Sequence, residues 1–152
     1  MLSKLPTADN LRKRGMVMVN RCCLCKTAEE SVDHLLIHCP VAKEMWDNVL
    51  SLFGVSWVMP CHVRGLIDRW LRGLVRHQYS LIWKAIPHCL MWCLWRERNM
   101  RSFEDTELGI PDLKLIFFRT LYDWILALGL FSFSSLQDFL DSCNSFEHQV
   151  YA

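Results

Sequence analysis

The stretch that decides the fold reads Cys22-Cys-Leu-Cys25, then His34-Leu-Leu-Ile-His-Cys39-Pro40. A C-x2-C turn lets two thiolates reach one ion without strain, and His34 and Cys39 complete four soft or borderline ligands within 18 residues. These are the residue types and the density that tetrahedral zinc requires. Four protein ligands leave no position for a reactive water, so the pattern predicts one structural Zn²⁺ ion.

Two nearby residues offer alternative ligands. Cys23 forms only a C-x-C pair with Cys25, so we favour Cys22 as the ligand. On a continuous helix, residues five apart differ by about 140° in direction, so His34 could share an ion with His38 but not with Cys39. Pro40 disfavours the helical conformation at Cys39. We therefore expect a bend there that turns the Cys39 thiolate back toward the site.

Three thiolates and one imidazole around a dication leave about one negative charge. Nearby basic side chains can offset part of it: Arg21, Lys26 and Lys43. Besides zinc ligation, cysteines in a chain of this kind can be buried free thiols or form a thioredoxin-like redox pair. We favour burial for Cys89 and Cys93, which lie in an apolar helical segment. A redox pair needs a βαβ pattern, and the sequence shows no strands.

Length and composition exclude several classes. The chain has 152 residues, a net charge of +1, 52% apolar residues and only six glycines, which excludes a wholly disordered chain and favours helices. Uncharged stretches such as Trp124–Gln137 and Ala85–Trp95 fall short of the about 20 residues of a membrane span. The start lacks the apolar core of a signal peptide, so we expect an intracellular protein without disulfides.

Apolar spacing and capping residues predict a mostly α fold. The expected helices cover residues 8–14, a segment from Ser31 to the bend at Cys39, and residues 41–53, 64–76, 81–103, 113–129 and 134–143. Residues 16–19 are expected to be a short extended segment or turn, Pro87 to start or kink its helix, and residues 96–101 to form a solvated polar tail. We thus predict a small zinc-stabilised module, residues 1–55, followed by a bundle of about four helices, residues 61–152.

A longer pattern surrounds the ligands. The segments Leu5-Pro-Thr-Ala-Asp-Asn-Leu-Arg-Lys-Arg-Gly-Met16, Cys22-Cys-Leu-Cys25, Glu30-Ser-Val-Asp-His34-Leu-Leu-Ile-His-Cys39-Pro40 and Trp46 resemble the zinc-binding region of plant LINE-type (non-LTR) reverse transcriptases. The resemblance covers about residues 5–53. It places the family's ligands on Cys22, Cys25, His34 and Cys39, while His38 falls where the family varies. A weaker match, Ile86-Pro87, Trp92, Trp95, Arg96-Glu-Arg98-Asn99 and Phe103, resembles the helical segment that follows in that family.

The sequence also departs from that family. The aromatic and basic segment that precedes the leucine-proline-threonine motif is absent, and no motif typical of a catalytic centre, such as the Asp pair of a polymerase, is found. We expect a detached C-terminal piece of a retroelement protein that is not an enzyme.

The resemblance implies a non-catalytic zinc module that helps a polymerase to hold RNA or single-stranded DNA. Four basic residues beside the ligands are candidates for phosphate contacts: Arg12, Lys13, Arg14 and Arg21. The plainer interpretation of these side chains is a solvated helix end. The alternative function is a protein-interaction scaffold or inert remnant, with the Arg-rich helix 64–76 and the Trp-rich helix 81–95 packing on a reverse transcriptase body or on a second copy. A nuclear location follows only from the resemblance.

Overall fold

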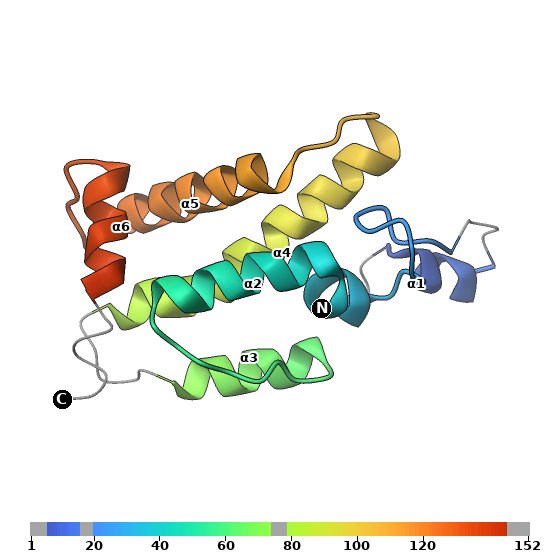
Figure 1. The fold of residues 1–152 in the computed structure, drawn as a ribbon, viewed down its shortest axis with the longest axis horizontal. Helices are drawn as coiled ribbons and strands as arrows, with labels where there is room; N and C mark the ends of the chain where they lie inside the picture. The colour runs from blue at the N-terminus through green and yellow to red at the C-terminus, as the bar shows by residue number, and fades with distance from the viewer. Residues whose placement is uncertain (1–5, 16–19, 74–78, 146–152) are drawn as a thin grey trace.

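The computed structural model describes residues 6–15, 20–73 and 79–145 (Figure 1). All the secondary-structure elements assigned in these ranges are helices, with no strand, which confirms the predicted fold class. The elements are α1 (Ala8–Lys13), a π-helical turn η2 (His34–His38), α2 (Pro40–Leu52), α3 (Val63–Arg72), α4 (Ser80–Phe103), α5 (Ile110–Ala127) and α6 (Leu136–Asn144). The extended segment expected at residues 16–19 lies outside the described residues.

Helix α4 is the central element of the fold. It packs against α2, α3, α5 and η2, and α6 packs against α5 (Figure 1). The segment that carries Cys22, Cys23 and Cys25 lies at the C-terminal end of α4, next to α1 (Figure 1). None of the helices in the described ranges is long and apolar enough to cross a membrane.

Some predicted helix boundaries differ from the observed ones. Helix α3 ends at Arg72, because Gly73 adopts an extended conformation with ψ of 152°. The predicted continuation over residues 74–76 falls outside the described residues. Helix α4 begins at Ser80, one residue before the expected start, so Pro87, which was expected to start or kink this helix, does not start it and lies buried inside it. Helix α6 begins at Leu136, two residues after the expected start at Ser134, because the Ser135 hydroxyl accepts a hydrogen bond from the Asp138 amide at 3.1 Å and caps the helix.

Tryptophans from three helices form the centre of the core. Trp70 of α3 and Trp83 of α4 stack with ring centroids 4.1 Å apart, and each indole N–H donates to the other residue's carbonyl, at 2.7 and 3.0 Å. Trp46 of α2 meets the Trp70 ring edge-on at 5.5 Å. The Trp-rich helix therefore contributes mainly to this chain's own core, although Trp92 remains 50% exposed. The core is continuous from Cys22 to Cys143, and the division at residues 55 and 61 stays a prediction.

The polar end of α4 is not a solvated tail, which corrects that prediction. Glu97 and Arg98 are each only 2% exposed. Arg98 pairs with Glu30, and Glu97 pairs with Arg101. Charged side chains are buried at this depth only where they are paired, and the partner of Arg98 lies 68 residues away, beyond the reach of a local pattern.

Candidate metal centre

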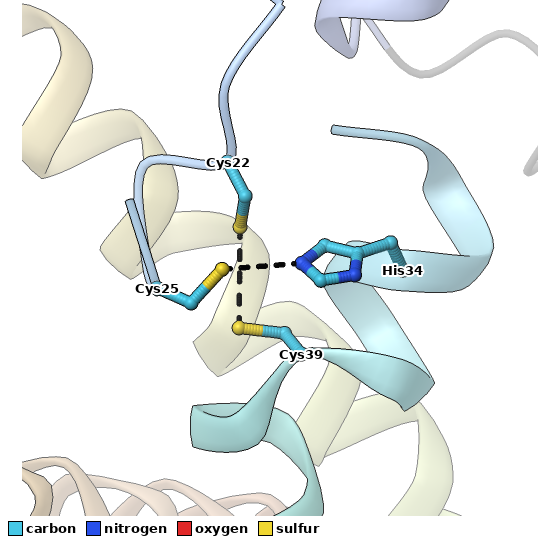
Figure 2. A group of neighbouring side chains, drawn as sticks. All are labelled: Cys22, Cys25, His34 and Cys39. Atoms are coloured by element: carbon cyan, nitrogen blue, oxygen red, sulfur yellow. Dashed lines mark hydrogen bonds between the residues drawn. The ribbon is translucent and has the colours of Figure 1, made fainter. Parts of the chain in front are cut away.

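Four side chains converge at the N-terminal end of the core. Their donor atoms all lie within 4.8 Å of one another: Cys22, Cys25, His34 and Cys39 (Figure 2). Cys22 Sγ is 3.9 Å from Cys39 Sγ, and Cys25 Sγ is 3.4 Å from His34 Nε2. A tetrahedron with ordinary zinc bond lengths separates two sulfurs by about 3.8 Å and a sulfur from a nitrogen by about 3.6 Å. The observed spacing is therefore consistent with a single zinc ion.

The first two ligands lie on a short loop, residues 22–28, which we call the metal loop. The loop is closed by hydrogen bonds from the Lys26 amide to the Cys22 carbonyl and from the Cys22 amide to the Ala28 carbonyl, both at 2.8 Å. Lys26 adopts a left-handed conformation with φ of 60°, which lets the chain reverse direction. The amides of Leu24 and Cys25 donate to the Cys22 sulfur.

A π-helical turn explains how the second pair of ligands, His34 and Cys39, can face one ion although they are five residues apart. The Cys39 amide donates to the His34 carbonyl at 2.6 Å, five residues back. A turn closed by such a bond is wider than an α-helical turn, so the residue five positions on points closer to the direction of the first residue than it would in an α-helix. Cys39 then leaves the helical conformation, with ψ of 136°, as Pro40 requires. The expected bend is present, and the π-turn brings His34 and Cys39 together across it.

Cys39 also gains from the helix that follows it. It occupies the N-cap position of α2, Pro40 is the first helical residue, and the Cys39 sulfur accepts the amides of Val41 and Ala42. A helix N-terminus favours negative charge. Backbone amides therefore offset the charge of the thiolates. The expected contribution of Lys26 is not made, because its ammonium pairs with Glu107 at 2.8 Å.

Hydrogen bonds between ligands shift their pKa values in opposite directions. The Cys22 thiol donates to the Cys39 sulfur, which raises the pKa of Cys22, as does burial, and lowers the pKa of Cys39. Burial acts to raise the pKa of Cys25, but hydrogen bonds from the Thr27 hydroxyl and from backbone amides outweigh it, so this pKa is lowered. Zinc ligation by Cys22 would require its thiol to lose the proton that it donates to Cys39, so zinc affinity would fall at low pH.

The two alternative ligands point elsewhere. Cys23 Sγ lies 3.1 Å from the Ser102 hydroxyl on α4, and His38 Nε2 donates to the Cys61 carbonyl at 2.8 Å. Among the remaining cysteines, Cys89 and Cys93 are buried, as expected, Cys143 is also buried and Cys61 is exposed. The described residues form no second group that could hold a metal ion.

The four residues predicted to contact phosphate are exposed and flank the centre. Arg12 and Lys13 lie in the last turn of α1, Arg14 follows that helix, and Arg21 precedes the first ligand. Lys13 reaches Asp9 at 3.7 Å, an exposed pair that contributes little to stability.

Sequence reasoning missed Glu30, which is 1% exposed. Its carboxylate accepts the Ala8 amide at the start of α1 at 2.8 Å and binds the Arg98 guanidinium at 2.8 Å. Glu30 thus joins α1 and the metal-binding segment to α4. The signal was present in the longer pattern, which contains both Glu30 and Arg98, but spacing alone does not reveal that they meet.

Comparison with known proteins places a zinc-binding domain on this part of the chain. A family model described as zinc-binding in reverse transcriptase matches residues 1–46, which include all four converging side chains. The match covers no catalytic domain. No curated protein and no solved structure matches the chain.

Proposed function

We propose that this chain supplies the structural zinc domain of a plant LINE-type reverse transcriptase and that this domain assists the parent polymerase in holding RNA or single-stranded DNA. The observation that carries the proposal is the Cys₃His cluster inside the matched residues 1–46. The order of the motifs around it supports the LINE type, and with it a nuclear location. A closed shell of four ligands supports a role without catalysis.

The bound ion would act as a cross-link. Structural zinc contributes on the order of 10 to 16 kcal/mol of apparent binding free energy in finger peptides, which is comparable with the whole stability of a domain. The ligands come from the metal loop and from η2 with the residue after it, so one ion would fix these two segments to each other. The exposed cations beside them would then stand on a rigid surface.

Charge favours that surface over the neighbouring cavity for phosphate contact. A cavity of about 710 Å³ is lined by Arg21, Lys26, Phe103 and Arg101, among others, but Glu30, Asp105 and Glu107 line it as well and nearly balance its charge. Arg12, Lys13 and Arg14 lie outside that lining, and the ion pair found among them joins Lys13 to Asp9 at 3.7 Å, whereas Arg21 also lines the cavity. We therefore assign phosphate contact to Arg12, Lys13, Arg14 and Arg21.

The metal is tested first, on the purified chain. We expect about one zinc per chain by elemental analysis. Chelation, or the substitution Cys25→Ser, should release the zinc and lower the helical signal in circular dichroism. A metal-free protein with a reactive Cys25 thiol would instead support redox chemistry.

The nucleic-acid role is tested by fluorescence anisotropy with a single-stranded RNA at several salt concentrations. Four phosphate contacts predict a slope of log affinity against log salt of about −3. Replacing Arg12, Lys13, Arg14 and Arg21 together by Ala should abolish most of this dependence. The matched control replaces four exposed cations elsewhere, namely Arg64, Arg69, Arg72 and Lys84. Undetectable or salt-independent binding would refute the role, and an equal loss in the control would refute the assigned surface.

One observation favours the second candidate function, association through an apolar surface. Large apolar side chains are exposed at the end of α5 and just beyond it: Trp124, Leu126, Leu128 and Leu130. Contiguous exposed apolar surface often marks a protein interface. Size-exclusion chromatography over a range of concentrations tests this alternative, and a monomer at all concentrations would count against self-association.

A further inference from the structure

An arginine outside the matched residues 1–46 forms hydrogen bonds with the backbone of the metal loop. Arg101, in the last turn of α4, has a side chain that is 8% exposed. Its Nη1 donates to the Leu24 carbonyl at 3.0 Å and, more weakly, to the Cys23 carbonyl at 3.4 Å. These two carbonyls lie between the ligands Cys22 and Cys25.

The Arg101 guanidinium is itself held from several sides. Its Nε donates to the Glu97 carboxylate at 2.6 Å, and its Nη2 donates to the Leu108 carbonyl at 2.9 Å. The same Glu97 oxygen accepts the Leu108 amide at 2.9 Å. Glu107, which pairs with Lys26 of the metal loop, lies 3.1 Å from Arg101 Nη1. Because the Glu97 side chain is only 1% exposed, this arrangement fixes the orientation of the arginine side chain.

The Cys23 and Leu24 carbonyls, which accept hydrogen bonds from Arg101, belong to the peptide units whose amides donate to the Cys22 sulfur. The Cys23 carbonyl shares a peptide plane with the Leu24 amide, and the Leu24 carbonyl shares one with the Cys25 amide. Those are the two amides that donate to the Cys22 sulfur. In a trans peptide the carbonyl and the amide point in opposite directions. A donor that holds each carbonyl outward therefore aims each amide inward, at the sulfur.

We propose that Arg101 is a positioning residue for the metal centre: it holds the metal loop in the conformation that binds metal, and the affinity for zinc depends on it. The inference rests on the zinc site and is independent of nucleic-acid binding. Groups that orient metal ligands typically change metal affinity about 10- to 100-fold when they are removed. The unit that binds zinc well would then extend from the metal loop to the end of α4.

The test measures zinc affinity of the full chain by competition with a chelator. We expect Arg101→Ala to weaken binding about 10- to 100-fold. Arg101→Lys keeps the charge but loses the planar fork, so it should restore only part of the affinity. The matched control is Arg96→Ala, an exposed arginine on the same helix, which should bind zinc like the parent chain.

Two further measurements separate positioning from general stability. Leu121→Ala removes a buried side chain of α5, outside the metal-binding segment, and should lower the stability of the fold without a comparable loss of zinc affinity. The absorption spectrum of bound Co²⁺, which reports the geometry of sulfur ligation, should change in Arg101→Ala and stay unchanged in Leu121→Ala.

The outcomes decide the proposal in either direction. It is overturned if Arg101→Ala folds and binds zinc as tightly as Arg96→Ala, or if Leu121→Ala weakens binding as much as Arg101→Ala does. If Arg101→Ala fails to fold, Glu97→Gln loosens the arginine without removing it, and an unchanged affinity in that variant overturns the proposal equally. If the parent chain binds zinc normally but does not bind RNA, only the proposed nucleic-acid function is refuted.

Discussion

The buried ion pair between Glu30 and Arg98 offers the sharpest test of the fold. Arg98 donates from Nε to both oxygens of the carboxylate at 3.2 Å and from Nη2 to one of them at 2.8 Å. The two side chains are 0% and 2% exposed. Removing one partner of a buried pair leaves an uncompensated charge and typically costs about 3 to 5 kcal/mol. Arg98 also lies over the rings of Trp95 and Phe103, at 5.4 and 5.8 Å.

We therefore expect Arg98→Met to lower the free energy of unfolding of the zinc-loaded chain by about 3 to 5 kcal/mol, a large part of the usual stability of a domain. Urea unfolding followed by circular dichroism measures the change. The double variant Glu30→Gln with Arg98→Met removes both charges and should lose less than the sum of the two single variants.

Lys114→Met provides the matched control, because it breaks an exposed pair with Glu44 at 3.0 Å. Such a pair contributes about 0 to 1 kcal/mol. If Arg98→Met costs no more than Lys114→Met, or if the two substitutions at the buried pair are simply additive, the reasoning about this pair is wrong.

Three further predictions concern single residues. Trp46→Phe removes the indole N–H that donates to the Leu36 carbonyl at 2.8 Å, so thermal or urea unfolding should show a loss of about 1 to 3 kcal/mol from the orphaned buried carbonyl; an unchanged stability would show that another donor replaces it. Ser135→Ala should cost about 0.5 to 2 kcal/mol through loss of the α6 cap, measured in the same way. Burial raises the pKa of Cys143 to about 12 from 9.0, so a thiol reagent at pH 8 should label Cys61 well before Cys143, as mass spectrometry can show. The same shift means that stability from Cys143 is full below pH 9.0 and declines as the pH rises toward 12.

Local signals in the sequence predicted the helices well. Pro40 and Gly54 mark the two ends of α2, and Gly54 adopts the left-handed conformation, with φ of 61°, that ends a helix. Apolar spacing identified α4 and α5 because each buries a continuous side in the core. These features depend on neighbours within a few residues, so they can be recognised from the chain alone.

The metal ligands were also predictable, but the backbone that presents them was not. Residue types and spacing indicated Cys22, Cys25, His34 and Cys39. The π-turn was missed because no residue type between His34 and Cys39 indicates one, and because a carbonyl within it, that of Leu36, is paired with the distant Trp46 indole N–H. Tertiary demands of this kind override local helical preference.

The main feature that sequence analysis failed to predict is the pairing of charged residues that lie far apart in the sequence. Glu97, Arg98 and Arg101 look like the solvated end of an apolar helix, since polar residues usually occupy helix ends. Their burial depends on the metal loop and on Glu30 arriving at that end of α4, and only the folded chain shows this. The charged residues could be seen in the sequence, but their pairing could not.

The separation between Glu30 and Arg98 has a consequence for synthesis of the chain. A ribosome that adds about 5 to 20 residues per second makes Cys39 within seconds of Cys22, but needs several seconds more to reach the arginine. All four ligands are thus translated while the Glu30 carboxylate still lacks its counter-charge. Until the end of α4 has been made, the metal-binding segment lacks both the Arg98 guanidinium that pairs with Glu30 and the Arg101 side chain that donates to the Leu24 carbonyl, so its final contacts form only after all four ligands have been translated.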